Sequence, residues 1–199
     1  MKKIVVFSFA LSAAFSLTAA QASDGQMQIN GQVFNTSCTI AIDGSPTANK
    51  TIVLDGIPVT ALSKSVNTVS GSALMASDTM KTVTISLKDC TLPQDKTTVG
   101  VSFDTNGYGD SRYSSYRNML LDSINTQSTA AKGVNIGFTA PGAETELVMG
   151  EDKAIFKAPD TNNEVAYDYQ IRYVTTGADT TGVTAGDLDT VATFSVVYE

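Results

Sequence analysis

The sequence contains no histidine and no tryptophan among its 199 residues. Without histidine, a Ser-His-Asp triad, a histidine metal ligand and the commonest general base near neutral pH are all excluded. Only two cysteines are present, Cys38 and Cys90, and two thiolates are too few for a four-ligand zinc site. The sequence therefore predicts no metal and no cofactor, and it favours a protein that is not an enzyme.

Charged residues are also scarce, at 17% of the chain. Acidic residues outnumber basic ones by 20 to 13, which gives a formal net charge of −7. Phosphate backbones repel a chain of this charge on average, so nucleic acid is excluded as a partner. Hydrophobic residues make up 42% of the chain, which is enough for a packed core in one or at most two domains.

The first 22 residues have the pattern of an export signal. Lys2 and Lys3 provide a positive start, an almost entirely apolar stretch covers residues 4–17, and a small-x-small motif ends at Ala22. The apolar stretch is shorter than the ~20 residues that span a bilayer. We therefore expect a cleaved signal peptide and a protein exported from the cytoplasm.

Export changes the expected chemistry of the two cysteines. In an oxidising compartment, Cys38 and Cys90 have no third thiol to compete with them and most simply form one disulfide. A reactive thiol is the alternative, but no histidine is available to activate it. The sequence therefore favours a structural bridge.

Alternation of apolar and polar residues dominates the rest of the chain, and no window keeps helical spacing for long. Each alternating stretch predicts a strand with one buried and one wet face, as in an antiparallel sandwich or barrel. The predicted strands cover residues 27–33, 38–42, 52–54, 83–87, 99–103, 134–138, 167–173 and 192–198. Residues 104–132 read as a surface excursion anchored by the apolar turn Met119–Leu121. A single all-β sandwich is the simplest architecture.

The beginning of the mature chain carries an apolar face that is unusual so close to a terminus. The residues on this face are Gly25, Met27, Ile29, Gly31 and Val33. Two interpretations are open at this point. The segment is either the first strand of its own sheet or a free arm that completes the sheet of another molecule by strand addition.

The last predicted strand also keeps its apolar face to the end of the sequence. Phe194, Val196 and Tyr198 share that face, and Glu199 follows. Soluble proteins usually protect such an edge with charge, proline or a bulge, and none is present here. This strand lies either between two strands of its own fold or beside a cleft that another chain fills.

Several separated motifs resemble the type 1 fimbrial pilin family, whose members are assembled by the chaperone-usher pathway of Gram-negative bacteria. The motifs are Asp24–Val33 followed by Asn35–Cys38, Ile85–Cys90, Tyr169–Tyr173 with Thr176 and Gly177, and Ala192–Glu199 with its penultimate tyrosine. Each motif is weak by itself. Their order and approximate spacing, together with the signal peptide, make a specific set.

The resemblance implies an immunoglobulin-like β-sandwich that lacks its seventh strand, with a hydrophobic groove beside the C-terminal strand. It divides the chain into a signal peptide at 1–22, a donor-strand extension at 23–34 and a pilin domain at 35–199. A periplasmic chaperone would lend a strand to the groove and hold the terminal carboxylate of Glu199. At the outer-membrane usher, the arm of the next subunit would replace the chaperone strand.

On this interpretation, the chain is a structural subunit of an adhesive fimbria on the cell surface, joined head to tail to neighbouring subunits. The donor residues would be Gly25, Met27, Ile29, Gly31 and Val33. The groove strand would contribute Phe194, Val196, Tyr198 and Glu199.

Two other function classes stay open. A binding module, or a minor adhesive subunit, would recognise a host glycan or protein through a candidate receptor loop. That loop contains Tyr108, Arg112, Tyr113, Tyr116 and Arg117. An exported hydrolase would use a carboxylate pair, Asp187 with Asp189 or Asp160 with Glu164, although acidic surface loops explain these residues more simply.

Overall fold

The computed structural model describes residues 38–121, 129–140, 143, 145 and 147–199. The predicted signal peptide, the predicted donor segment at 23–34 and the predicted strand at 27–33 lie outside these residues. Helical structure in the described part is limited to three short 3-10 turns, η1 (Val59–Ala61), η2 (Met119–Leu121) and η3 (Glu151–Lys153). No helix among the described residues has the length and apolar character needed to cross a bilayer.

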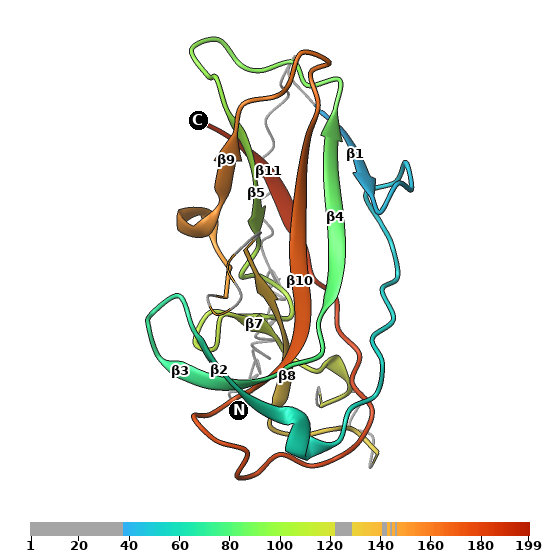
Figure 1. Ribbon diagram of the computed structural model, residues 1–199, viewed down its shortest axis with the longest axis vertical. Coiled ribbons are helices and arrows are strands. Elements are labelled where there is room, and N and C mark those ends of the chain that lie inside the picture. The colour runs from blue at the N-terminus through green and yellow to red at the C-terminus, as the bar shows by residue number, and fades with distance from the viewer. Residues whose placement is uncertain (1–37, 122–128, 141–142, 144, 146) are drawn as a thin grey trace, which may run out of the picture. The chain divides into compact units, whose positions relative to one another are not determined.

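The described strands form two antiparallel sheets (Figure 1). The first sheet has the order β1 (Thr39–Ile42), β4 (Lys81–Lys88), β10 (Val165–Thr175), β8 (Val134–Thr139), β7 (Ser115–Tyr116) and β6 (Gly109–Asp110). A hairpin of β2 (Leu62–Asn67) and β3 (Ala73–Ser77) joins this sheet through β10. The second sheet has the order β11 (Phe194–Tyr198), β5 (Val99–Phe103) and β9 (Ile155–Lys157).

The main core lies between the two sheets and follows the period-2 alternation of the strands. On β10, Tyr167, Tyr169 and Ile171 are buried, while the intervening Asp168 and Gln170 are not. Phe103 of β5 packs its ring 4.8 Å from that of Tyr169 and 4.4 Å from that of Phe138. These contacts join the sheets face to face, as expected for a sandwich.

A second, smaller cluster lies on the other face of β10, beneath the β2–β3 hairpin. Its buried members are Val66, Leu74, Ala76, Leu147 and Val174. Val174 pairs directly with Ala76, so the hairpin continues the sheet across the end of β10. Arg172 on this face is fully buried, and its guanidinium contacts the sulfur of Met80. The hairpin therefore covers a face of β10 that the apolar–polar alternation of its sequence predicts to be exposed to solvent.

Most predicted strands are confirmed, with boundaries shifted by one or two residues. The prediction of a strand at residues 52–54 is wrong, because no ladder forms there. Ile52 and Leu54 nevertheless pack against the main core, while Val53 between them is 71% exposed. The alternation in this stretch thus reflects the burial of alternate side chains without a partner strand.

The predicted anchor of the 104–132 excursion is also wrong in detail. The apolar turn η2 is only partly buried, and Leu121 is 36% exposed. The excursion is instead held by Tyr116, whose side chain is fully buried and whose hydroxyl lies 3.0 Å from the Asp104 carbonyl oxygen and 2.8 Å from that of Thr193. Buried Tyr116 therefore ties this segment to the start of β11, and buried Asn118 ties it to the preceding loop through a hydrogen bond to the Asp187 carbonyl at 2.9 Å.

Candidate functional site

The C-terminal strand β11 has one open edge. Among the described strands it pairs only with β5, in a register that places Val196 opposite Val101 and Tyr198 opposite Val99. The main-chain N–H and C=O groups along its other edge have no partner in any described strand. Edges of this kind are templates for the addition of another strand.

The inward face of β11 is apolar and only half buried. Phe194, Val196 and Tyr198 all pack against the main core, and Phe194 lies 6.4 Å from Phe103 between ring centroids. Burial raises the pKa of the Tyr198 phenol, which agrees with its partly apolar surroundings. Three of the predicted groove residues, Phe194, Val196 and Tyr198, therefore share one apolar face of β11, and the fourth, Glu199, directly follows the strand.

The end of β11 is fixed to the start of β5. The main-chain oxygen of Glu199 accepts hydrogen bonds from the amides of Thr97 and Thr98, both at 2.9 Å, and from the Thr98 hydroxyl at 3.0 Å. The Glu199 amide donates in return to the Thr98 carbonyl at 3.0 Å. These four bonds fix the residue that follows β11, so the C-terminal end of the open edge is held in place.

The first sheet ends at β1, which pairs only with β4 among the described strands. The disulfide between Cys38 and Cys90 closes the end of this ladder, where Thr39 is paired with Lys88. Half-buried Ile40 of β1 packs against the same core cluster as the inward face of β11. Both sheets thus end in a strand with a half-buried apolar side chain that reaches the shared core, although Ile42 of β1 is buried.

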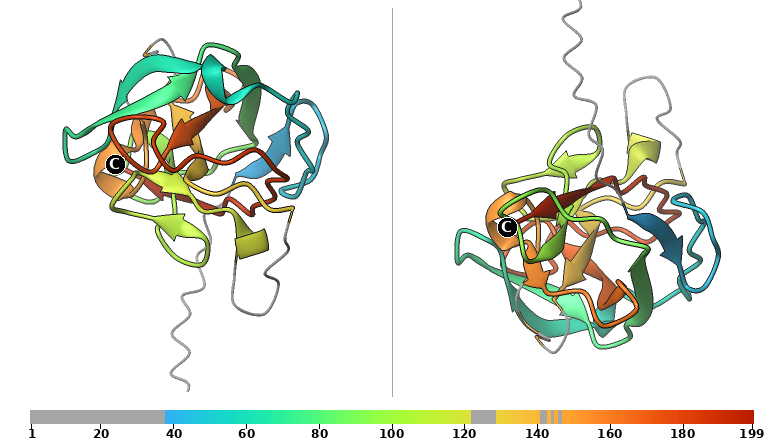
Figure 2. Two further views of the ribbon diagram at one scale, coloured as in Figure 1. Left: turned by 90° about the horizontal axis from the view of Figure 1, so that it is seen from below. Right: turned by 90° about the horizontal axis from the view of Figure 1, so that it is seen from above.

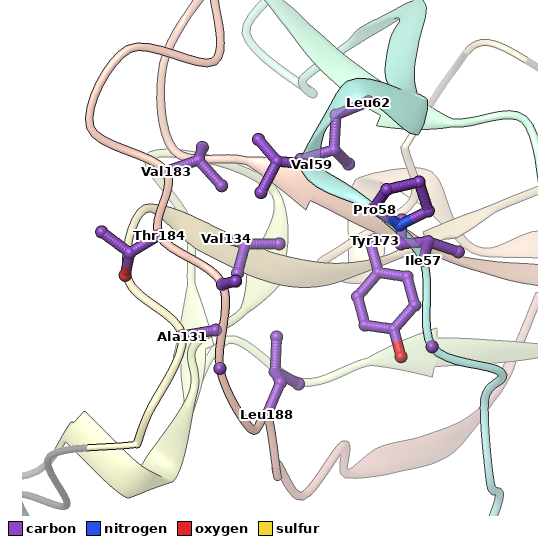
Figure 3. A pocket seen from close by; sticks show the side chains of 13 residues that line it. Ile57, Pro58, Val59, Leu62, Ala131, Val134, Tyr173, Val183, Thr184 and Leu188 are labelled. Atoms are coloured by element: carbon purple, nitrogen blue, oxygen red, sulfur yellow. The ribbon is translucent and has the colours of Figure 1, made fainter.

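An apolar pocket of about 130 Å³ lies beside the chain that leads into β11. Figure 3 shows apolar side chains from separate segments gathered around it, with Val59 near Val183 and with Leu188 beside Ala131 and Val134. Tyr173 of β10 lines the pocket, and its pKa is raised by burial and by the charge of Asp55. Because an apolar cavity of about 150 Å³ can hold benzene, this pocket has room for one apolar side chain.

The loop before β11 is held against residues 129–132 by main-chain contacts. The Asp187 amide donates to the Thr129 carbonyl at 2.8 Å, and the Ala131 amide donates to the Asp187 carbonyl at 2.9 Å. A Cβ atom on Gly186 would lie only 2.2 Å from that Thr129 oxygen. Position 186 therefore requires glycine so that the two backbones can approach closely.

We expect the substitution Gly186→Ala to lower the unfolding temperature of the purified protein by roughly 5 °C, because the added methyl group must displace backbone atoms. The matched control is Gly177→Ala in the same loop, where a Cβ atom meets nothing within 4 Å. Thermal unfolding followed by circular dichroism would measure the difference. Equal unfolding temperatures for the two variants would contradict the close packing described above.

Comparison with known proteins agrees with this arrangement, although no family model matches the chain. Long polar fimbria protein A of Salmonella typhimurium (strain LT2) is 32% identical over 204 residues, which cover all of this chain and 98% of that protein. The probable major fimbrial subunit LpfA of Escherichia coli O157:H7 is 30% identical over 207 residues, with the same coverage. The chain belongs to this family of fimbrial subunits.

The fold of this fimbrial subunit is also found in a solved chaperone-usher pilus, with a TM-score of 0.51 over 92% of this chain and 99% of that chain, at 20% identity. The likeness confirms the predicted immunoglobulin-like sandwich of chaperone-usher pilins. The predicted resemblance to fimbrial pilins is confirmed as well. A fimbria on the cell surface is the corresponding location.

The five residues of the candidate receptor loop differ in their exposure and in the pocket that they line. Tyr108, Tyr113 and Arg117 line a second pocket, and the exposed Arg112 lies over the Tyr113 ring at 5.4 Å. Tyr116 is fully buried, so its assignment to a receptor surface is wrong. Burial raises the pKa of this phenol, whose role is structural. Sequence proximity alone could not distinguish it from its exposed neighbours.

Asp160, a member of one carboxylate pair proposed for a hydrolase, is held as a hydrogen-bond acceptor within its own turn. Asp160 accepts hydrogen bonds from the amides of Glu164 and Asn162, and these bonds hold the pKa of the Asp160 carboxyl below its usual value. A general acid near neutral pH needs a raised pKa. Asp160 therefore stabilises its own turn.

Proposed function

We propose that this chain forms fibres by accepting an extended segment of another molecule along the open edge of β11 and by lending residues 23–34 to the next subunit. The observation that carries the proposal is the pairing of β11 with β5 alone among the described strands. The half-buried apolar face of β11 supports the same interpretation, because a partner that covered this face would remove apolar surface from water.

The alternating donor segment suits this edge chemically. Strand addition would give main-chain hydrogen bonds along β11 and would bury the side chains of Met27, Ile29 and Val33, each contributing about 1.5–3 kcal/mol before ordering costs. Gly25 and Gly31 on the same face would allow close approach to the receiving sheet.

A contact between the arm of one subunit and the edge of the next is heterologous, because donor and acceptor are different surfaces. A heterologous contact whose rotation does not close produces an open filament. Each copy of the chain therefore carries both the donor segment and the acceptor edge. Burial of apolar side chains at each contact would drive polymerisation without a nucleotide or a metal.

Before polymerisation, the edge of β11 requires a temporary cover. We assign this role to a periplasmic chaperone that lends a strand and binds the carboxylate at Glu199, and we assign the exchange of strands to an outer-membrane usher. The likeness of the fold to a chaperone-usher pilus subunit supports this order of events. An unprotected edge would otherwise pair with other copies at random.

Because apolar and polar residues alternate along the predicted donor segment, the donor role can be tested by adding the same charge to either of its two faces. We expect the double substitution Met27→Asp and Ile29→Asp to reduce subunit incorporation into fibres by at least roughly 100-fold, since two carboxylates would have to enter an apolar site. The control is Gln28→Asp with Asn30→Asp, which adds the same charge to the opposite face. Fibres sheared from cells and quantified by immunoblot, relative to total subunit, give the measurement.

Deletion of residues 23–30 extends this test. The shortened subunit should still be captured by the chaperone, because its β11 edge is intact, but it cannot donate to a neighbour. Fibres that carry the shortened subunit in their interior, or equal incorporation of the two double variants, would refute the donor role of the arm.

A further inference from the structure

A polar, aromatic-lined cavity of about 360 Å³ lies beside the β6–β7 hairpin, and no residue of β11 lines it. Its lining includes Tyr108, Asp110, Tyr113 and Arg117 from the hairpin and its flanks, and Asn135 and Thr176 from the ends of β8 and β10. Figure 2 shows the hairpin, in light green, at the margin of the sandwich. The volume falls in the range of small-ligand sites.

The walls of this cavity are held by hydrogen bonds within the fold. The Arg117 amide donates to the Tyr108 carbonyl at 2.8 Å, and the Arg117 guanidinium donates to the Gly107 carbonyl at 3.1 Å. The Asp110 carboxylate accepts from the Arg112 amide at 3.1 Å. A ligand would therefore meet a wall that is already ordered, and its binding would carry little cost for ordering the loop.

The floor of the cavity is fixed in the same way. The buried side chain of Asn135 donates to the Ser115 hydroxyl at 3.0 Å, and the Ser114 hydroxyl accepts from the Val69 amide at 2.7 Å. Tyr108 packs against the main core and Tyr113 against the smaller cluster, so each ring has one fixed side. Both rings are only half buried.

We propose that this cavity binds a neutral hexose unit of a glycan. Each half-exposed tyrosine offers an apolar ring face to the C–H groups of a sugar and a hydroxyl to its oxygens. No hydrogen bond joins either tyrosine hydroxyl to another described residue, so no described residue competes with a ligand for these hydroxyls. Asp110 adds a carboxylate acceptor for paired sugar hydroxyls, and such charge-assisted bonds are among the strongest available.

The charges around the cavity argue against an anionic ligand. Among the described lining residues Arg117 is the only cation, Asp110 offsets its charge, and one of its nitrogens is already bonded to Gly107. A second cation, Arg112, stacks on Tyr113 and is not part of the lining. The whole chain carries a formal charge of −7, which repels sialylated or sulfated chains at long range. A purely apolar ligand would leave the polar groups of the lining unpaired.

Purified fibres of the wild-type subunit, immobilised and probed with an array of neutral, sialylated and sulfated oligosaccharides, would test the proposal. We expect neutral hexose-containing glycans to be retained. Asp110→Asn should reduce their binding by about tenfold while keeping the acceptor that bonds to Arg112, and Tyr108→Phe should reduce it by removing only a hydroxyl. Ser111→Ala, an exposed change in the same hairpin and outside the lining, is the matched control.

Fibre yield provides a separate readout for each variant. Normal yield with lost glycan binding would support a binding role for the cavity, and these conservative variants should assemble because β11 and the arm are unchanged. Retention of acidic glycans alone, absence of any retained glycan, or wild-type binding by Asp110→Asn and Tyr108→Phe would each overturn the proposal. None of these results would affect the role proposed for the β11 edge.

Discussion

Replacing Val196 with glutamate is expected to reduce incorporation of the subunit into fibres by roughly 100-fold or more, whereas the same change at Val197 leaves most incorporation intact. Val196 lies at the centre of β11, opposite the buried Val101, and its side chain packs against the main core. A carboxylate there would have to be buried without a partner when a donor strand covers the edge, which costs several kcal/mol.

Val197 is a matched control because it carries the same side chain one residue further along the same strand. It pairs with Gly100 and does not belong to the main core cluster, so its side chain lies on the other face. The fraction of each variant found in sheared fibres, measured against total subunit, gives the comparison. Equal incorporation of the two glutamate variants would mean that the inward face of β11 is not an acceptor surface.

A milder substitution separates failure to assemble from failure to fold. Val196→Ala removes two methyl groups without adding charge, and we expect a partial loss of incorporation with normal amounts of soluble subunit. Protease resistance of the chaperone-bound subunit would report whether each variant is folded. A graded decrease from valine through alanine to glutamate, with folding preserved, is the outcome that supports the acceptor role.

Replacing both Cys38 and Cys90 with alanine is expected to remove about 4 kcal/mol of stability, given their sequence separation of 52. The bridge closes the ladder between β1 and β4, and β1 has only four residues and no second partner strand among those described. Without the bridge, β1 can separate from β4 and expose the core from that side. Chaperone capture should therefore decrease.

The yield of chaperone complex from the periplasm measures this effect, and treatment of the wild-type protein with a thiol reductant should reproduce it. A suitable control replaces Thr39 and Thr91, which neighbour the two cysteines, with alanine. Equal yields from the cysteine variant and this control would show that the bridge is dispensable for capture.

The sequence predicted the strands that span the main core because their alternation is undisturbed. In β10, every second residue from Tyr167 to Ile171 is apolar and buried, and the pattern leaves no other interpretation. The β2–β3 hairpin was missed because its buried side chains at Val66, Leu74 and Ala76 are few and separated by serine, lysine and methionine. Its position is set by tertiary packing on β10.

The candidate site was predictable in part for similar reasons. The apolar face of β11 could be predicted because three alternating residues of one short segment form it. The cavity beside the hairpin could not, because the fold brings Asn135 and Thr176 next to residues 108–117. The burial of Tyr116 likewise depends on distant partners at Asp104 and Thr193. The residues next to Tyr116 in the sequence therefore do not predict that its side chain is buried.

The open edge of β11 has a cost for the cell that makes the protein. The segment Phe194–Tyr198 is rich in β-forming residues and contains no charge and no proline, which is the composition of segments that nucleate aggregation. On the function proposed above, a newly secreted copy without a donor strand would aggregate with other copies unless a chaperone captured it first. The supply of chaperone would then have to match the rate of translation, and overproduction of this subunit alone would be toxic in proportion to the concentration of uncovered β11 edges.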